Sequence, residues 1–215
     1  MSVSPDPAES AAASAPLDSA PARHRAETRR RLVAAATELF ARQGLRATTS
    51  TQIARAAGVA AGTFYLHFAD KQALFREIAF GALAELRARM EAAQRAVAER
   101  GLEAQLRARM EELVGFADEK RDLVRIVFGR GHEADAIGDE LADELFPGVE
   151  ARLRERIEED RADPALHPAV AAQALIAGWT RVVAWWVEDP SRAPREAVVE
   201  TLVRLHPVFT HRRGR

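Results

Sequence analysis

Four side chains able to form polar contacts stand close together early in the chain. Thr63, Tyr65 and His67 alternate over five residues, and Lys71 follows four residues later. A threonine hydroxyl and methyl can contact base edges in the major groove of DNA, whereas tyrosine, histidine and lysine can reach backbone phosphates. Each residue alone is common on protein surfaces, but the four together favour nucleic-acid recognition.

Two short helices must position these side chains. The pattern predicts helices over residues 50–57 and 61–67, joined at Gly58, which can adopt the positive φ of a tight turn. Phe64 and Phe68, four residues apart, would bury one face of the second helix and leave the polar side chains outside. This is the design of a helix-turn-helix whose second helix enters the major groove.

Residues 28–75 resemble the DNA-binding domain of the TetR family of bacterial transcriptional regulators. The resemblance rests on the run Ile-Ala…Ala-Gly-Val…Gly-Thr-Phe-Tyr-x-His-Phe…Lys, which ends at Lys71. Ala60 and Ala61 depart from the serine and the longer polar residue of many members, which leaves base readout to fewer side chains. The resemblance implies DNA contacts from Ser50, Thr51, Ala61, Gly62, Thr63, Tyr65, Leu66, His67 and Lys71.

Charge is distributed unevenly along the chain, although the net charge is only −1. Between Pro21 and Lys71 there are nine basic and three acidic residues, so the remainder is acidic. A basic segment attached to an acidic body is typical of a nucleic-acid-binding module. A solvated, arginine-rich helix face would give the same distribution.

The fold class is predicted to be all-α, because no segment alternates as a strand does. We expect a disordered tail (1–22), a three-helix helix-turn-helix DNA-binding domain (23–71) and a helical effector-binding and dimerisation domain (72–210). A capping box at Thr49 and Gln52 and a cap at Asp70 would begin two of the helices. Breaks are expected at Gly101, Gly129/Gly131, Pro147-Gly148, Pro164 and 189–191. The remaining helices are predicted near 26–43, 71 to the 90s, 102–117, 121–129, 136–161, 167–188 and 194–206.

Several classes of function are disfavoured by composition. The chain has no cysteine, no run of eighteen apolar residues and no signal-peptide order at its start, so we expect a cytoplasmic protein without a membrane span. No catalytic constellation follows residue 72, so we expect no enzyme, no cofactor and no metal. His132, Glu133 and Asp135 lack a second histidine at helical spacing, which favours a solvated loop.

The last two helices carry apolar stripes beyond the needs of one small core. By analogy with TetR relatives, in which the last two helices pair, these stripes predict an isologous homodimer on a double-stranded DNA operator with half-sites about 34 Å apart. The expected interface comprises Ala171, Ala174, Gly178, Val182, Val198, Leu202 and Leu205.

The resemblance also implies a small-molecule cavity in the body. No buried cluster of charge is evident, so we expect an apolar or aromatic effector. The candidate lining residues are Phe80, Leu83, Phe116, Ile126, Phe128, Trp179 and Val183, each of which could equally be plain core. Two alternatives stay open: a DNA-binding protein without small-molecule sensing, and a helical enzyme or interaction module with a vestigial helix-turn-helix.

Overall fold

The computed structural model describes residues 20–129 and 135–206, and these residues contain helices but no strand. The all-α prediction is therefore confirmed. Short 3₁₀ turns follow α4 and α8. The α-helices are α1 (Ala20–Ala47), α2 (Ser50–Ala56), α3 (Ala61–Tyr65), α4 (Lys71–Ala96), α5 (Leu102–Glu119), α6 (Arg121–Phe128), α7 (Asp135–Glu158), α8 (Pro168–Glu188) and α9 (Arg195–Arg204).

Most predicted helix bounds agree with these within a few residues, with two corrections. Helix α1 begins at Ala20, so residues 20–22 are helical and do not belong to a tail. The break predicted at Pro147-Gly148 is wrong, because α7 runs through Pro147. The packing of α7 against α4, α6 and α8 offsets the backbone hydrogen bond that a proline removes. Residues 1–19, the loop residues His132 and Glu133, and residues 207–210 lie outside the described residues.

The local signals read from the sequence are present. The amide of Thr49 donates to the Gln52 Oε1 atom (2.8 Å), and the Gln52 amide donates to the Thr49 hydroxyl (3.2 Å), which completes the capping box. The Ala73 amide donates to the Asp70 carboxylate at the start of α4 (2.7 Å). Gly58 has a φ of 66°, the left-handed conformation that lets α2 turn directly into α3.

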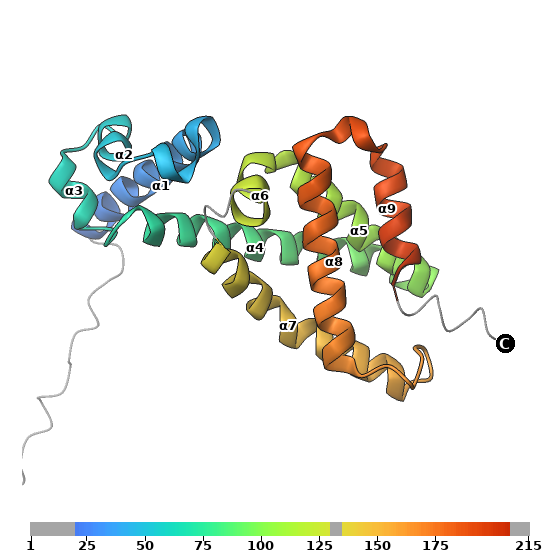
Figure 1. Ribbon diagram of the computed structural model, residues 1–215. Coiled ribbons are helices and arrows are strands. Elements are labelled where there is room, and N and C mark those ends of the chain that lie inside the picture. The colour runs from blue at the N-terminus through green and yellow to red at the C-terminus, as the bar shows by residue number, and fades with distance from the viewer. Residues whose placement is uncertain (1–19, 130–134, 207–215) are drawn as a thin grey trace, which may run out of the picture.

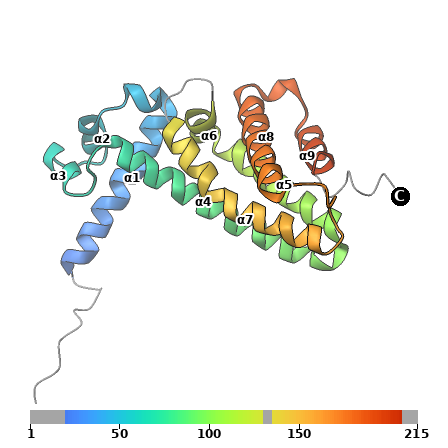
Figure 2. The ribbon, with the colours of Figure 1, turned by 60° about the horizontal axis from the view of Figure 1, so that its bottom comes forward.

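Helices α1–α3 gather at one end of the molecule, and α4 leads from them along the whole body (Figure 1). Helix α5 packs against α4, and α7 runs beside α4 as well, as the turned view shows (Figure 2). Helix α8 packs against α5, α6 and α7, and α9 packs against α5. Helix α4 thus reaches from the helix-turn-helix into the body, and α6 of the body also contacts α1.

The hydrophobic core beneath α1–α3 extends into the body. It is built on fully buried residues of the helix-turn-helix such as Leu32 and Phe64, and Val127 of α6 and Leu141 of α7 belong to the same cluster. Residues from both parts of the chain therefore share one core. A change in the position of α6 or α7 must be accommodated by the packing under the helix-turn-helix.

Helix α8 is long and apolar enough to cross a membrane by length and composition, the one such helix among the residues described. Core helices of globular proteins pass the same test. Nearly half of the apolar stretch of α8 is buried inside the protein, including Ile176, Val183 and Trp186. This burial is that of a core helix.

Candidate functional site

The outer face of α3 is exposed, whereas the inner face of the same helix is buried. Tyr65 and Leu66 are 62% and 72% exposed, whereas Phe64 beside them is fully buried. A Cβ placed on Gly62 would have no neighbour within 4 Å, so packing inside the chain does not require glycine there. Of the other predicted contact residues, Thr51 and Ala61 are exposed, and Ser50, Thr63, His67 and Lys71 are half-buried. All of the predicted contact residues therefore keep exposed or partly exposed surface.

Arginines of α1 hold the carboxyl-terminal ends of the two short helices. The Arg31 guanidinium donates to the carbonyls of Ala57 and Gly58 at the end of α2. Arg29 donates to the carbonyl of His67 (3.0 Å), pairs with Glu77 and covers the ring of Phe68. Cations stabilise the carbonyl ends of helices. Part of the positive charge of this segment is thus structural.

His67 lies at the rim of the exposed face and titrates below its ordinary range. Burial lowers the pKa of His67, and the nearby charges of Arg25 and Arg29 lower it further. At neutral pH the imidazole is uncharged. A neutral imidazole has one N–H group that can donate a hydrogen bond.

The Lys71 ammonium fastens the start of α4 to the end of α1. It donates to three backbone carbonyls: Leu45 (2.8 Å), Arg46 (3.0 Å) and Thr48 (2.7 Å). An ammonium has three N–H donors, and all three are occupied here. In this structure the ammonium therefore has no free donor for the phosphate contact expected of Lys71. Sequence reasoning missed this role because these carbonyls lie more than twenty residues away along the chain.

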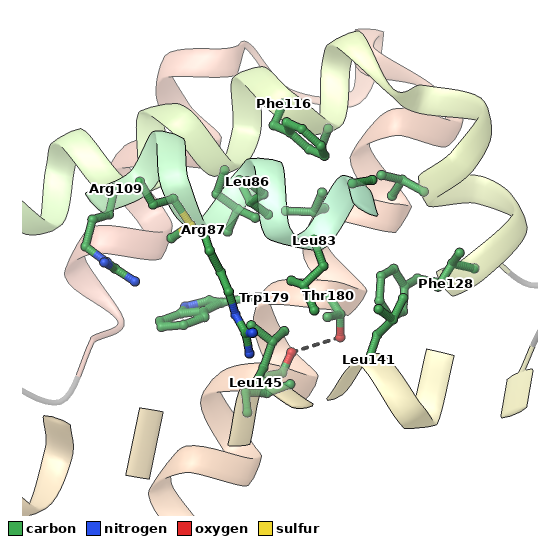
Figure 3. A pocket seen from close by; sticks show the side chains of 18 of the residues that line it. Leu83, Leu86, Arg87, Arg109, Phe116, Phe128, Leu141, Leu145, Trp179 and Thr180 are labelled. Atoms are coloured by element: carbon green, nitrogen blue, oxygen red, sulfur yellow. Dashed lines mark hydrogen bonds between the residues drawn. The ribbon is translucent and has the colours of Figure 1, made fainter. Parts of the chain in front are cut away.

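A cavity of about 380 Å³ lies in the body between α4, α5, α6, α7 and α8 (Figure 3). Five of the seven candidate lining residues border it: Leu83, Phe116, Phe128, Trp179 and Val183. Phe80 and Ile126 do not border it. They pack instead against the hydrophobic core beneath α1–α3. The volume is that of a small-molecule site.

Charged side chains also line this cavity. Arg87, Arg109, Arg152 and Glu91 contribute to its walls, from α4, α5 and α7. None of the four is buried, since Arg87 and Arg109 are half-buried and Glu91 and Arg152 are exposed. The expectation that no buried cluster of charge lies in the body is therefore not contradicted. The sequence hid the cluster because its members lie on three helices and meet only in the folded chain.

The residues predicted for a dimer interface divide into two groups. Ala171, Val198 and Leu202 are buried within the protomer, where they pack in its own cores, so they have little surface left for a partner. That part of the predicted interface is corrected. Ala174, Gly178 and Leu205 are exposed and Val182 is half-buried.

The helix-turn-helix at one end and the helical body with a cavity define a one-component regulator architecture, and known proteins share it. The sequence profile of the "Bacterial regulatory proteins, tetR family" matches residues 32–78. The HTH-type transcriptional regulator AcrR of Shigella flexneri is 48% identical over 52 residues, which span only about a quarter of either chain (24% of each). The uncharacterised HTH-type transcriptional regulator YdgC of Bacillus subtilis is 30% identical over 133 residues, 60% of this chain and 67% of YdgC.

A solved structure agrees over most of the chain. The transcriptional regulator FadR of Bacillus subtilis, in complex with stearoyl-CoA, superposes with a TM-score of 0.66 at 18% identity, covering 84% of this chain and 98% of FadR. At this identity the likeness shows the fold alone. The matching profile and the similarity to YdgC show that the chain belongs to the TetR family of bacterial transcriptional regulators.

Replacing Lys71 by methionine separates a structural role from a phosphate contact. Lys71→Met keeps the side-chain length but leaves three carbonyls without donors, so the DNA-binding domain should lose on the order of 3 kcal/mol of stability. Because Lys71 contacts no phosphate in this account, the slope of log K for DNA against log salt should not change. Denaturation and salt titrations of operator binding measure the two effects.

Lys120→Met is the matched control, because the Lys120 ammonium makes an exposed ion pair with Glu85 (3.6 Å) and a cation–π contact with Phe116, both within the body. It should alter neither quantity. A Lys71→Met variant of unchanged stability, with a salt slope shallower by about one unit, would restore the phosphate role.

Proposed function

We propose that this chain is a ligand-responsive cytoplasmic repressor that binds a near-palindromic DNA operator as a homodimer. The observation that carries the proposal is the exposed face of α3, which stands over a fully buried Phe64 and is held from behind by α1 arginines. The buried packing holds the exposed side chains of α3 rigidly in place. A rigid helix surface of this kind suits insertion into a DNA groove of fixed width.

Within this proposal the contact residues have different tasks. Thr63 reads a base edge, and the bare backbone at Gly62 lets α3 approach the groove floor. Tyr65 and the neutral His67 donate to phosphates, together with Ser50 and Thr51 in the first turn of α2. Lys71 has no direct contact and positions the start of α4.

Removing single polar groups from α3 tests this assignment. Thr63→Ala and Tyr65→Phe should each weaken operator binding by about 1–3 kcal/mol, because one base-edge or phosphate contact is lost. Fluorescence anisotropy with a labelled operator measures the loss, and circular dichroism should show unchanged helix content and melting.

Thr37→Ala on α1 is the matched control. The Thr37 hydroxyl donates to the carbonyl of Val33, and its side chain faces a cavity shared with α4 and α6. It should bind operator as the unaltered protein does. Equal affinities of all three variants would remove α3 from the interface.

We call helices α1–α3 of each protomer its reading unit. A homodimer formed through α8 and α9 supplies the second reading unit. The exposed face of α8 contains Val170, Ala174 and Gly178, and Leu205 after α9 is 67% exposed. Small residues let a second helix approach closely, and exposed apolar residues gain stability when covered. In the dimer the two α3 helices would lie about 34 Å apart, the spacing of successive major grooves.

Gly178→Leu tests the dimer because the glycine has open space around it within the protomer. A Cβ at this position meets no atom within 4 Å, so leucine should leave the protomer folded. In a close helix pairing the same side chain would collide with the partner, and the variant should be monomeric at micromolar concentration by light scattering. A Gly178→Leu variant that stays dimeric would move the interface elsewhere.

Regulation is proposed to run from the body cavity through α4 to the reading unit. FadR, a structural neighbour, binds stearoyl-CoA, which supports a small-molecule effector for the cavity here. Ala79, Leu83, Val127 and Leu141 line the cavity and also belong to the core beneath α1–α3. A ligand that displaces these residues must shift the reading unit, and operator DNA must weaken ligand binding by the same factor.

A further inference from the structure

A second, smaller cavity adjoins the main one at the Trp179 end. It measures about 40 Å³, and Arg109, Val149, Arg152 and Trp179 line both cavities. We call this smaller space the arginine annex, because Arg156 also lines it. Arg109 and Trp179 lie at one end of the main cavity and Phe128 and Leu141 at the other (Figure 3). The combined space therefore has an apolar end and a cationic end.

The three guanidinium groups of the annex lack carboxylate partners. In residues 20–129 and 135–206, none of Arg109, Arg152 and Arg156 forms an ion pair. Arg109 donates to the side-chain oxygen of Gln94 (3.0 Å), and the Nη1 atom of Arg156 is buried without a hydrogen-bond partner. Burial and the charge of Arg152 lower the pKa of Arg109 to about 10. Arg109 and Arg156 are half-buried and Arg152 is exposed. Like charges this near one another repel, and an anion among them would relieve the repulsion.

Neighbouring arginines show that the chain does pair its cations elsewhere. Arg107, two residues before Arg109 on α5, pairs with Glu200 (2.6 Å). Arg154, between the two annex arginines of α7, pairs with Glu150 (2.6 Å). Arg87 in the main cavity pairs with Glu144 (2.9 Å). Arginines without an ion pair also occur elsewhere, but Arg31 and Arg195, for example, donate to backbone carbonyls. In the annex, by contrast, the Nη1 atom of Arg156 is buried without a hydrogen-bond partner.

The remaining polar groups around the annex do not neutralise it. Glu91 is the one carboxylate among the described residues that line either cavity, and it is exposed, with Arg95 3.8 Å away. His206 stacks on Trp179, and burial together with the charges of Arg156, Arg109 and Arg152 lowers its pKa to about 4. The imidazole is therefore neutral near pH 7. The carboxylates of Glu91, Glu155 and Glu159 act on the guanidinium groups but form no ion pair with them among the described residues.

We propose that the annex binds the anionic head group of an amphipathic effector whose apolar body fills the main cavity. The head group is a carboxylate or a phosphate, held by the guanidinium groups of Arg109, Arg152 and Arg156. The annex has room for about three water-sized groups, which suits such a head group and is too small for a nucleotide. This inference rests on the proposed function only in treating the cavity as the effector site.

Binding of matched twelve-carbon compounds to the full-length protein, measured by calorimetry without DNA, tests the inference. Dodecanoate and dodecyl phosphate supply the two head groups on one chain, and dodecanol supplies the chain alone. At least one of the two anions should bind about tenfold or more tightly than dodecanol, because charge-assisted hydrogen bonds form in the annex. Equal affinities of both anions and the alcohol would overturn the proposal.

Charge-removing variants locate the head group. Arg156→Gln and Arg109→Gln should weaken binding of the anion about tenfold or more and leave the affinity for dodecanol unchanged, which also shows that the cavity is intact. Arg154→Gln, on the same helix but paired outside the annex, is the matched control and should change neither affinity. Unchanged anion binding in Arg156→Gln and Arg109→Gln would overturn the assignment.

Two further outcomes separate this inference from its alternatives. Tight binding of the dodecanoyl thioester of coenzyme A, with no binding of dodecanoate or dodecyl phosphate, would overturn it, because a thioester places no charge in the annex. Annex-dependent anion binding that leaves operator affinity unchanged would support the site and contradict the proposed regulation. The two proposals can thus fail independently.

Discussion

The contact on which the rest of the structure depends is the ammonium of Lys71 among the carbonyls of Leu45, Arg46 and Thr48. Helix α1 and the link to α2 end in carbonyl groups that no helical amide can satisfy, and one lysine supplies three donors to them. The same lysine is the first residue of α4. The contact therefore caps the helix-turn-helix and joins it to the helix that crosses the body.

Packing extends this connection from one contact to a continuous core. Ala79 and Leu83 of α4 line the cavity and belong to the cluster that buries Leu32 and Phe64 of the helix-turn-helix. Protein interiors are close-packed, so a displacement of these side chains by a ligand must also move their neighbours. The fold thus gives one packed unit in which α4 and α6 join the body cavity to the helix-turn-helix.

Local features of the sequence predicted the fold well, because their partners are near in the chain. The capping box of Thr49 and Gln52, the Asp70 cap and the positive φ of Gly58 each depend on residues within four positions. The candidate site was harder to predict. The role of Lys71 depends on carbonyls before α2, and the arginine annex forms only when α5 and α7 meet. Residue types alone do not reveal partners this far apart in the chain. They therefore favour a DNA contact for Lys71 and do not indicate the annex.

If α1–α3 move with α4 as one rigid piece, a pair of spin labels on α1 will report the movement. The chain has no cysteine, so Ala34→Cys on the exposed side of α1 places one label on each protomer of the proposed dimer. Pulsed electron paramagnetic resonance then gives the distribution of distances between the labels before and after the effector, for which dodecanoate is the first probe. The account predicts a shifted mean distance with an unchanged width as operator affinity falls. A broader distribution around an unmoved mean would contradict it, because the reading unit would then loosen and not move with α4.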